Sequence, residues 1–231
     1  MELILTCEHA TNHIPSQYEH LFVDARSVLQ GHRGWDPGTL ALGRMLQRRF
    51  SAVLFRTTVS RLLVEVNRSA NHRQLFSQYS RSLDQRDKAA VLQRYYWPYR
   101  QRIEEWIEDR VAAALPVLHL SLHSFVPELD GQVRTAELGL LYDPRRPAEK
   151  AFCDRWRDAL KISRPDLRTR RNYPYLGRSD GLTTALRQRF PDPYYIGIEV
   201  EVNQALVGPA SGWQRLKRDL AATLQATLEK S

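Results

Sequence analysis

The stretch Leu118-His119-Leu120-Ser121-Leu122-His123-Ser124-Phe125 contains both the most apolar strand-like run near the middle of the chain and a candidate functional histidine. The apolar run of residues 117–122 predicts a buried strand that ends before Pro127. A histidine at the end of a core strand is held rigidly and can still face a cleft. His123 is therefore the reference point around which the other reactive side chains are arranged.

The rest of the chain alternates strand-like with helix-like segments. Strands are expected at residues 2–7, 52–57, 62–66, 117–122, 137–142 and 194–202. Helices are expected at residues 37–50, 87–115, 147–160, 181–190 and 212–228, with a kink at Pro98. This alternation predicts an α/β fold with a mixed, mostly parallel sheet flanked by helices. We expect one domain of residues 1–231 with a helical excursion at about 69–115.

The composition is that of a globular protein. The 231 residues are 42% hydrophobic and 26% charged, and no apolar run approaches a membrane span. The N-terminus lacks the basic region of a signal peptide, and Cys7 and Cys153 are too few for a disulfide framework, so we expect a cytoplasmic protein with no membrane partner. The net charge of +8 comes mostly from arginines scattered among acids, which favours small anionic ligands over nucleic acid. Nothing in the sequence indicates an oligomeric state.

Two histidines follow or end predicted strands. His9 comes directly after the strand of residues 2–7, and His123 ends the central one. In α/β sheets, ligands bind beyond the carboxyl ends of the strands. A catalytic zinc commonly takes three ligands from His, Asp and Glu and leaves one position for water. Asp36 and Glu8 are both candidates for the third ligand, although Asp36 could be only a helix N-cap and each histidine only a hydrogen-bonded strand-end residue.

Two glutamates interrupt the last apolar strand. Glu199 and Glu201 are two residues apart in the run of residues 196–202, so both side chains point to the same face. A carboxylate in so apolar a strand is costly unless a cation, a proton or a metal is its partner. The pair indicates a charged site, or else an edge strand with a solvated acidic face. A carboxylate near a metal-activated water can act as general base and then as general acid.

The dipeptide Asn67-Arg68 places an amide beside a planar guanidinium, a combination that suits recognition of a carboxylate. A salt bridge inside the fold is the alternative, and Arg61 and Arg134 could do either job. The sequence contains no GxGxxG, GxxxxGK[ST], GxSxG or paired CxxC motif. Ser124 beside His123 remains conceivable as a nucleophile, although neighbouring strand positions point opposite ways, and so does Cys7 with His9.

Six short motifs occur in an order that is similar to a known family. They are residues 7–15 (CEHATNHIP), 36–38 (DPG), 63–68 (LVEVNR), 121–125 (SLHSF), 172–175 (NYPY) and 201–203 (EVN). The ordered set resembles the N-formylglutamate amidohydrolase family over nearly the whole chain, from residue 5 to about 207. The resemblance implies a phosphorylase/hydrolase-like α/β fold akin to the zinc carboxypeptidases, with one zinc ion.

The resemblance also implies a metal site. His9 and His123 look like zinc ligands. The carboxypeptidase pattern has a glutamate three residues after the first histidine, but this chain has Asn12 there. Asp36 is therefore preferred over Glu8 as the third ligand.

Further roles follow from the same resemblance. Glu201, which opens the Glu-Val-Asn motif, looks like the general base, and Glu199 is an extra acid beside it. Asn67 and Arg68 resemble the clamp for the substrate carboxylate, with Arg68 also taking part in catalysis. The remaining candidates for substrate binding are Arg134, Asn172 and Tyr175.

The expected reaction is hydrolysis of the amide C–N bond of a small N-acyl acidic amino acid. The type reaction implied by the resemblance converts N-formylglutamate to glutamate and formate. A metal-dependent hydrolase of small peptides and a non-catalytic binder of an acidic ligand are the alternatives.

Overall fold

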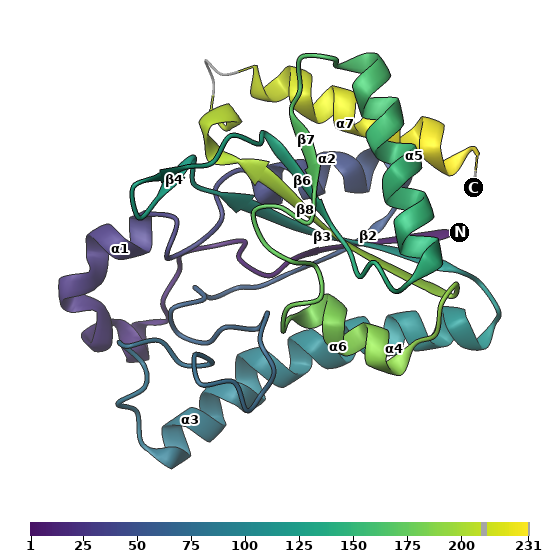
Figure 1. Ribbon diagram of the computed structural model, residues 1–231. Coiled ribbons are helices and arrows are strands. Elements are labelled where there is room, and N and C mark those ends of the chain that lie inside the picture. The colour runs from purple at the N-terminus through teal and green to yellow at the C-terminus, as the bar shows by residue number, and fades with distance from the viewer. Residues whose placement is uncertain (209–211, 231) are drawn as a thin grey trace.

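A six-stranded sheet of order β2-β1-β3-β8-β6-β7 runs through the centre of the protein (Figure 1). The structure is a computed structural model that describes residues 1–208 and 212–230. All neighbouring strands are parallel except β6 and β8. The predicted single α/β domain with a mixed, mostly parallel sheet is confirmed. The strands are β1 (Glu2–Cys7), β2 (Val53–Arg56), β3 (Val117–Phe125), β6 (Leu138–Leu141), β7 (Thr169–Arg171) and β8 (Tyr195–Asn203).

Helices cover both faces of this sheet (Figure 1). One face is covered by α2 (Thr39–Phe50), α5 (Pro147–Ser163) and α7 (Trp213–Leu228). The other is covered by α4 (Trp97–Ala112) and α6 (Leu182–Arg189), and α4 is preceded by α3 (Gln85–Val91) and η2 (Leu92–Tyr96), which extend beyond the sheet. Shorter elements lie near the carboxyl ends of the strands: η1 (Ser16–Ala25), α1 (Arg26–Gln30), the hairpin of β4 (Glu128–Leu129) and β5 (Gln132–Val133), and η3 (Gln204–Leu206).

The central strand β3 is buried along all its nine residues. Successive side chains of a strand point to opposite faces. Leu118, Leu120 and Leu122 join the apolar core under α2, α5 and α7. His119 and His123 point to the opposite face, where His119 contacts Tyr195 of β8. The opposite face also carries apolar residues such as Ile4 and Val117, but its polar side chains gather toward the carboxyl ends of the strands, and we call it the polar face.

The strand predicted at residues 62–66 was wrong. Residues 61–63 form a turn, and residues 62–66 pair with no strand that the structure describes. Leu63, Val64 and Val66 are nevertheless buried, in the apolar core beside α4 and α6. A short apolar run looks the same in a buried turn as in a buried strand, so periodicity could not separate the two.

The long helix predicted over residues 87–115 is divided into α3, η2 and α4. The five residues of η2 form a π-helix, and Pro98 lies in the first turn of α4 directly after it. The proline ring clashes with the carbonyl four residues earlier and provides no N–H, so the preceding turn is wider. The predicted break at Pro98 is confirmed, and its distortion lies on the N-terminal side.

Several short elements were missed, namely η1, α1, β4, β5 and β7. The central strand β3 continues to Phe125, so His123 lies inside the strand and not after it. Cys7 and Cys153 are buried free thiols. Among the residues described, no helix combines the length and apolar character needed to cross a membrane.

Candidate metal centre and active site

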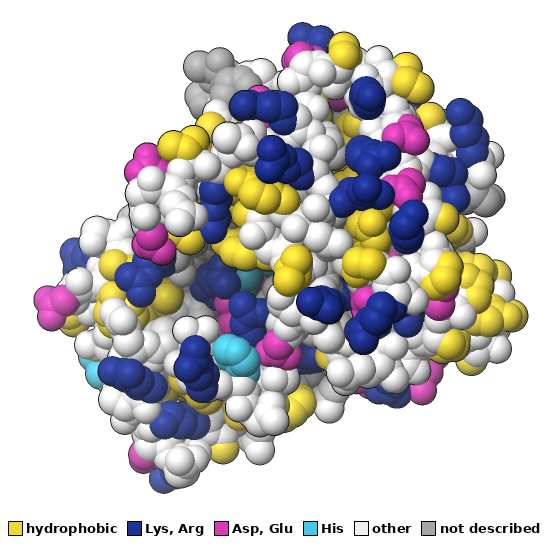
Figure 2. Space-filling view, viewed as in Figure 1, with side chains coloured by type: hydrophobic (Ala, Val, Ile, Leu, Met, Phe, Trp, Pro, Cys, Tyr) yellow, Lys and Arg dark blue, Asp and Glu magenta, His cyan; other side chains and the backbone are white. Residues whose placement is uncertain are grey.

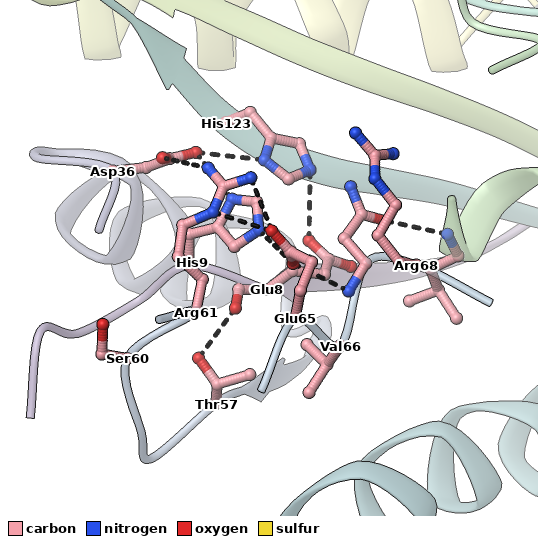
Figure 3. A network of polar contacts seen from close by, with 12 residues as sticks. Glu8, His9, Asp36, Thr57, Ser60, Arg61, Glu65, Val66, Arg68 and His123 are labelled. Carbon is pink, nitrogen blue, oxygen red and sulfur yellow. Dashed lines mark hydrogen bonds and ion pairs between the residues drawn. The ribbon is translucent and has the colours of Figure 1, made fainter. Parts of the chain in front are cut away.

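The side chains of His9, Asp36 and His123 meet at the carboxyl ends of the parallel strands (Figure 3). His9 follows β1, Asp36 lies before α2, and His123 is on β3. Nδ1 of His9 lies 3.2 Å and Nδ1 of His123 lies 3.1 Å from the same oxygen, Oδ2 of Asp36. Ligand atoms around a tetrahedral zinc, with bonds of roughly 2.0 Å, lie about 3.3 Å apart. The three side chains therefore fit a divalent metal ion.

The second nitrogen of each imidazole is held by another carboxylate. Nε2 of His9 lies 2.7 Å from Oε1 of Glu65, and Nε2 of His123 lies 3.4 Å from Oε2 of Glu8. Nε2 of His123 also lies 2.9 Å from the hydroxyl of Ser121, which donates to Glu8. Such outer contacts fix the orientation of a metal-binding imidazole. Glu8 thus lies behind His123, while Asp36 is the carboxylate that reaches both Nδ1 atoms.

The cluster stabilises an added positive charge. Burial opposes charging of His123, yet the hydrogen bond to Asp36 and the charge of Glu8 raise its pKa to about 10. Burial and Arg61 oppose charging of His9 as well, and carboxylates still raise its pKa. Burial would raise the pKa of Asp36, but the two histidines lower it far below its usual range. Carboxylates arranged to stabilise charged imidazoles also suit a metal cation.

Glu201 lies beside His123 in the pairing of β8 with β3. Its side chain is only 4% exposed, and no residue that the structure describes donates a hydrogen bond to its Oε2. Burial raises the pKa of Glu201 to about 7. Gly139 of β6 pairs with Glu201 on the other side. A Cβ atom at position 139 would collide with the carbonyl oxygen of Tyr173, so the position requires glycine. Glu201 is thus a buried carboxylate that is free to accept a proton.

A cavity of about 230 Å³ opens onto these side chains. Figure 2 shows basic side chains spread over this face of the molecule and a hollow in which histidine and acidic side chains are visible. The lining combines the candidate metal ligands with charged, polar and apolar groups. It includes His9, His32, Asp36, Arg61, Asn67, Arg68, His123, Leu129, Tyr175, Ser179, Asp180, Glu199 and Glu201.

Asn67 and Arg68 line the cavity and keep donors for a ligand. Oδ1 of Asn67 accepts the backbone N–H of Leu182 at 2.8 Å, and Nη1 of Arg68 donates to the backbone carbonyl of Asp180. Within the described part of the chain, the Asn67 amide nitrogen and the other guanidinium nitrogens of Arg68 have no partner. A guanidinium beside a free amide can bind a carboxylate.

Arg61 is bound to two carboxylates of the site. Its Nη2 lies 2.6 Å from Oε2 of Glu65, and its Nη1 lies 3.6 Å from Oδ1 of Asp36. The side chain is 28% exposed and lines the cavity. Arg61 therefore balances the negative charge around the candidate metal ligands.

Of the further residues predicted to bind substrate, Tyr175 lines the cavity, whereas Arg134 and Asn172 do not. Nη1 of Arg134 donates to the hydroxyl of Tyr175 at 3.1 Å. Oδ1 of Asn172 accepts the backbone N–H groups of Tyr142 and Gly177, at 3.0 and 3.1 Å. Asn172 therefore holds the loop that carries Tyr175, and direct substrate contacts by Arg134 and Asn172 stay predictions.

The two nucleophiles considered from the sequence are engaged elsewhere. The hydroxyl of Ser124 donates to the carbonyl of Pro37 at 3.0 Å. Cys7 is completely buried, and burial raises the pKa of its thiol well above the usual value. Neither side chain is an activated nucleophile in this arrangement.

Two cavity residues, His32 and Asp180, were not predicted from the sequence, and neither was the contact of Glu65 with His9. Oδ2 of Asp180 accepts from the backbone N–H and the hydroxyl of Ser69, at 3.1 and 3.2 Å, and so joins two irregular loops. The run of residues 178–181 has the serine, aspartate and glycine of a turn. That signal predicts a loop but not its position in the cavity.

The chain is similar to known proteins over most of its length. The family model for N-formylglutamate amidohydrolase matches residues 1–207. The crystal structure of a gene product from Agrobacterium tumefaciens is similar, with a TM-score of 0.83 and 28% identity over 99% of this chain and 91% of that one. N-formylglutamate amidohydrolase from Ralstonia eutropha has a similar fold, with a TM-score of 0.73 and 18% identity over 99% of this chain and 93% of that one. The search of curated proteins found no match. The chain belongs to the N-formylglutamate amidohydrolase family and is thereby a hydrolase of amide C–N bonds other than peptide bonds.

Proposed function

We propose that this hydrolase is metal-dependent and cleaves the amide bond of a small N-acyl acidic amino acid, with N-formylglutamate as the type substrate. One observation carries the proposal: the buried set of His9, Asp36 and His123 lies in the same cavity as the unpaired carboxylate of Glu201. Two imidazoles and one carboxylate form a ligand set typical of catalytic zinc, which makes zinc the ion we expect.

The chain's own groups can carry the proton transfers. A divalent ion bound by the three ligands would polarise the amide carbonyl and make a water molecule more acidic. Glu201 accepts the proton of the attacking water at its free Oε2 and returns it to the leaving nitrogen. Its burial matters, because a buried carboxylate holds a proton more readily near neutral pH than an exposed one.

The substrate is oriented by the groups beside the metal ligands. Arg68 binds the carboxylate of the amino-acid part, and the amide nitrogen of Asn67 adds a second donor. This contact holds the scissile amide next to His123 and Glu201, and such positioning contributes to catalysis by itself. Glu8 and Glu65 keep the two imidazoles in their binding orientation.

The test is release of formate from N-formyl-L-glutamate by chelator-treated protein, with and without added zinc. We expect turnover only with the metal, and a higher KM for Arg68→Gln. Full turnover after complete metal removal would contradict the metal dependence. Ligand binding without turnover over a panel of N-acyl amino acids would identify a binding protein. Faster cleavage of dipeptides than of N-acyl amino acids would identify a peptidase.

A further inference from the structure

A second cavity, of about 660 Å³, adjoins the catalytic cavity. Four side chains line both cavities, namely His32, Arg61, Leu129 and Tyr175. The second cavity extends from them over the irregular segment of residues 73–81. We call it the arginine groove, and its basic lining residues are His32, Arg33, Arg61, Arg73 and Arg81.

The arginine groove carries uncompensated positive charge. Arg33, Arg73 and Arg81 are exposed, and none of them forms an ion pair with any residue that the structure describes. Glu65 is the single acid in the described lining of the groove, and it is already bound by Arg61 and His9. Three guanidinium groups without a protein partner attract anions.

The groove also offers apolar surface next to this charge. Phe76, Tyr79, Leu129 and Tyr175 contribute to its lining. Aliphatic carbons can pack against these side chains while carboxylates reach the guanidinium groups. The lining therefore suits a chain that alternates short aliphatic stretches with carboxylates.

The position of the groove indicates which part of the substrate it would contact. Arg68, the proposed clamp for the amino-acid carboxylate, lines the catalytic cavity and not the groove. Figure 3 shows Arg61, which lines both, and Arg68 on either side of His123. A substrate whose amino-acid part is bound by Arg68 therefore directs its acyl part over Arg61 into the groove. A formyl group is too small to leave the catalytic cavity.

We propose that the arginine groove binds an extended acyl group that carries carboxylates. The preferred substrates are then amides that join such an acidic acyl chain to an amino acid, and N-formyl amino acids are cleaved with a lower kcat/KM. This inference rests on the proposed function, because it takes the amide to be cleaved beside His123. Exposed ion pairs are individually weak, so the preference comes from the guanidinium groups acting together.

The test compares kcat/KM for three glutamate amides: N-formyl, neutral N-hexanoyl, and N-(4,6-dicarboxyhexanoyl), which is the hexanoyl chain with two added carboxylates. The variants are Arg33→Gln/Arg73→Gln/Arg81→Gln and a charge-matched control, Arg44→Gln/Arg48→Gln/Arg218→Gln, whose arginines are exposed on α2 and α7. We expect the wild type and the control to prefer the acidic acyl chain. The groove variant should lose about 10-fold of the ratio of acidic to formyl kcat/KM.

Two kinetic results would overturn the inference: an unchanged ratio in the groove variant, or a wild-type preference for the formyl or hexanoyl amide. Binding of the free acid, pentane-1,3,5-tricarboxylate, measured by calorimetry at low and high salt, separates the groove from catalysis. Loss of binding in the groove variant supports the proposed role of the groove as a site for an acidic acyl group, even where no amide is hydrolysed. Equal binding by the groove variant and the control refutes it even where N-formylglutamate is hydrolysed.

Discussion

One face of β1, β3 and β8 carries leucine, isoleucine and valine at alternate positions, whereas the other face carries His119, Ser121, His123 and Glu201. The two faces share a backbone and differ in what their side chains do. The apolar face packs under α2, α5 and α7 and contributes stability through burial. The polar face buries groups that stabilise the fold only when each has a partner.

On the polar face, some buried polar atoms have hydrogen-bond partners and others have none among the described residues. His119 has hydrogen-bond partners on both nitrogens, Thr6 at 2.8 Å and Tyr195 at 2.7 Å. Within the described residues, Oε1 of Glu8 and Oε2 of Glu201 have none. Unpaired buried carboxylates reduce stability, and proteins keep such groups where function requires them. Substitutions on the two faces should therefore affect different properties.

The largest effect is expected on the polar face, for Glu201→Gln. The amide cannot accept the proton, and loss of a general base lowers kcat about 10²–10⁴-fold. Steady-state turnover of the zinc-loaded variant measures this, with metal content and unfolding free energy as controls. Glu199→Gln is the matched variant, since Glu199 shares the strand but its Oε1 accepts from Thr183. An equal loss in both variants would mean that Glu201 is not the base.

On the apolar face, Leu120→Ala should reduce the unfolding free energy by about 2–5 kcal/mol, because Leu120 is completely buried and its removal leaves a cavity. The turnover of the folded fraction should not change. Urea unfolding with parallel kinetics checks both points, and Leu115→Ala at a position 46% exposed is the control. A lower kcat with normal stability would contradict the view that the apolar face affects stability and not turnover.

The next effect concerns pH. Burial lowers the pKa of His119 to about 4 from 6.5. Between these values the unfolded chain binds the extra proton, so the contribution of His119 to stability is complete at high pH and is lost as pH falls. The loss from pH 8 to pH 5 is about 2 kcal/mol. In urea unfolding, the change in unfolding free energy from pH 8 to pH 5 should be more favourable by about 2 kcal/mol in His119→Gln than in the wild type. The raised pKa values of His9, His123 and Glu201 act in the opposite direction in both proteins and cancel in this comparison. An equal change in the two proteins would show that His119 is not the titrating group.

The smallest effect is expected for Glu8→Gln. Glu8 contacts His123 from behind, and replacing such a partner typically weakens metal binding about 10–100-fold. Competition with a chelating dye measures the zinc affinity directly. Glu2→Gln, at the exposed start of β1, the strand that ends directly before Glu8, is the control. Equal zinc affinities in the two variants would mean that Glu8 does not support metal binding by His123.

The regular parts of the fold were predictable because their patterns are periodic. The alternation in β3 and β8 and the helical spacing in α2, α5 and α7 come from packing on the apolar face. Residues 62–66 show the limit, since burial without a sheet partner leaves the same apolar pattern. The irregular segment of residues 69–84 has no period at all, and its structure follows from side-chain contacts across the chain.

The site was likewise predictable where its residues lie on or next to regular elements, and not where they lie on irregular loops. His9, His123 and Glu201 lie on or beside strands whose ends can be located from sequence, and Asp36 lies just before a helix. Other groups depend on loops. Glu65, Asp180 and the arginines of the groove reach the site through turns whose course no local pattern predicts. Figure 3 shows Glu65 beside His9, a contact between residues 56 positions apart.

We expect a metal ion to bind between His9, Asp36 and His123, at the carboxyl ends of the parallel strands. Anomalous diffraction at the zinc absorption edge, from crystals of the zinc-loaded protein, tests it most directly. We expect one strong peak bounded by Nδ1 of His9, Nδ1 of His123 and Oδ2 of Asp36. A peak bound by Glu8 in place of Asp36, or no peak among these side chains, would contradict it.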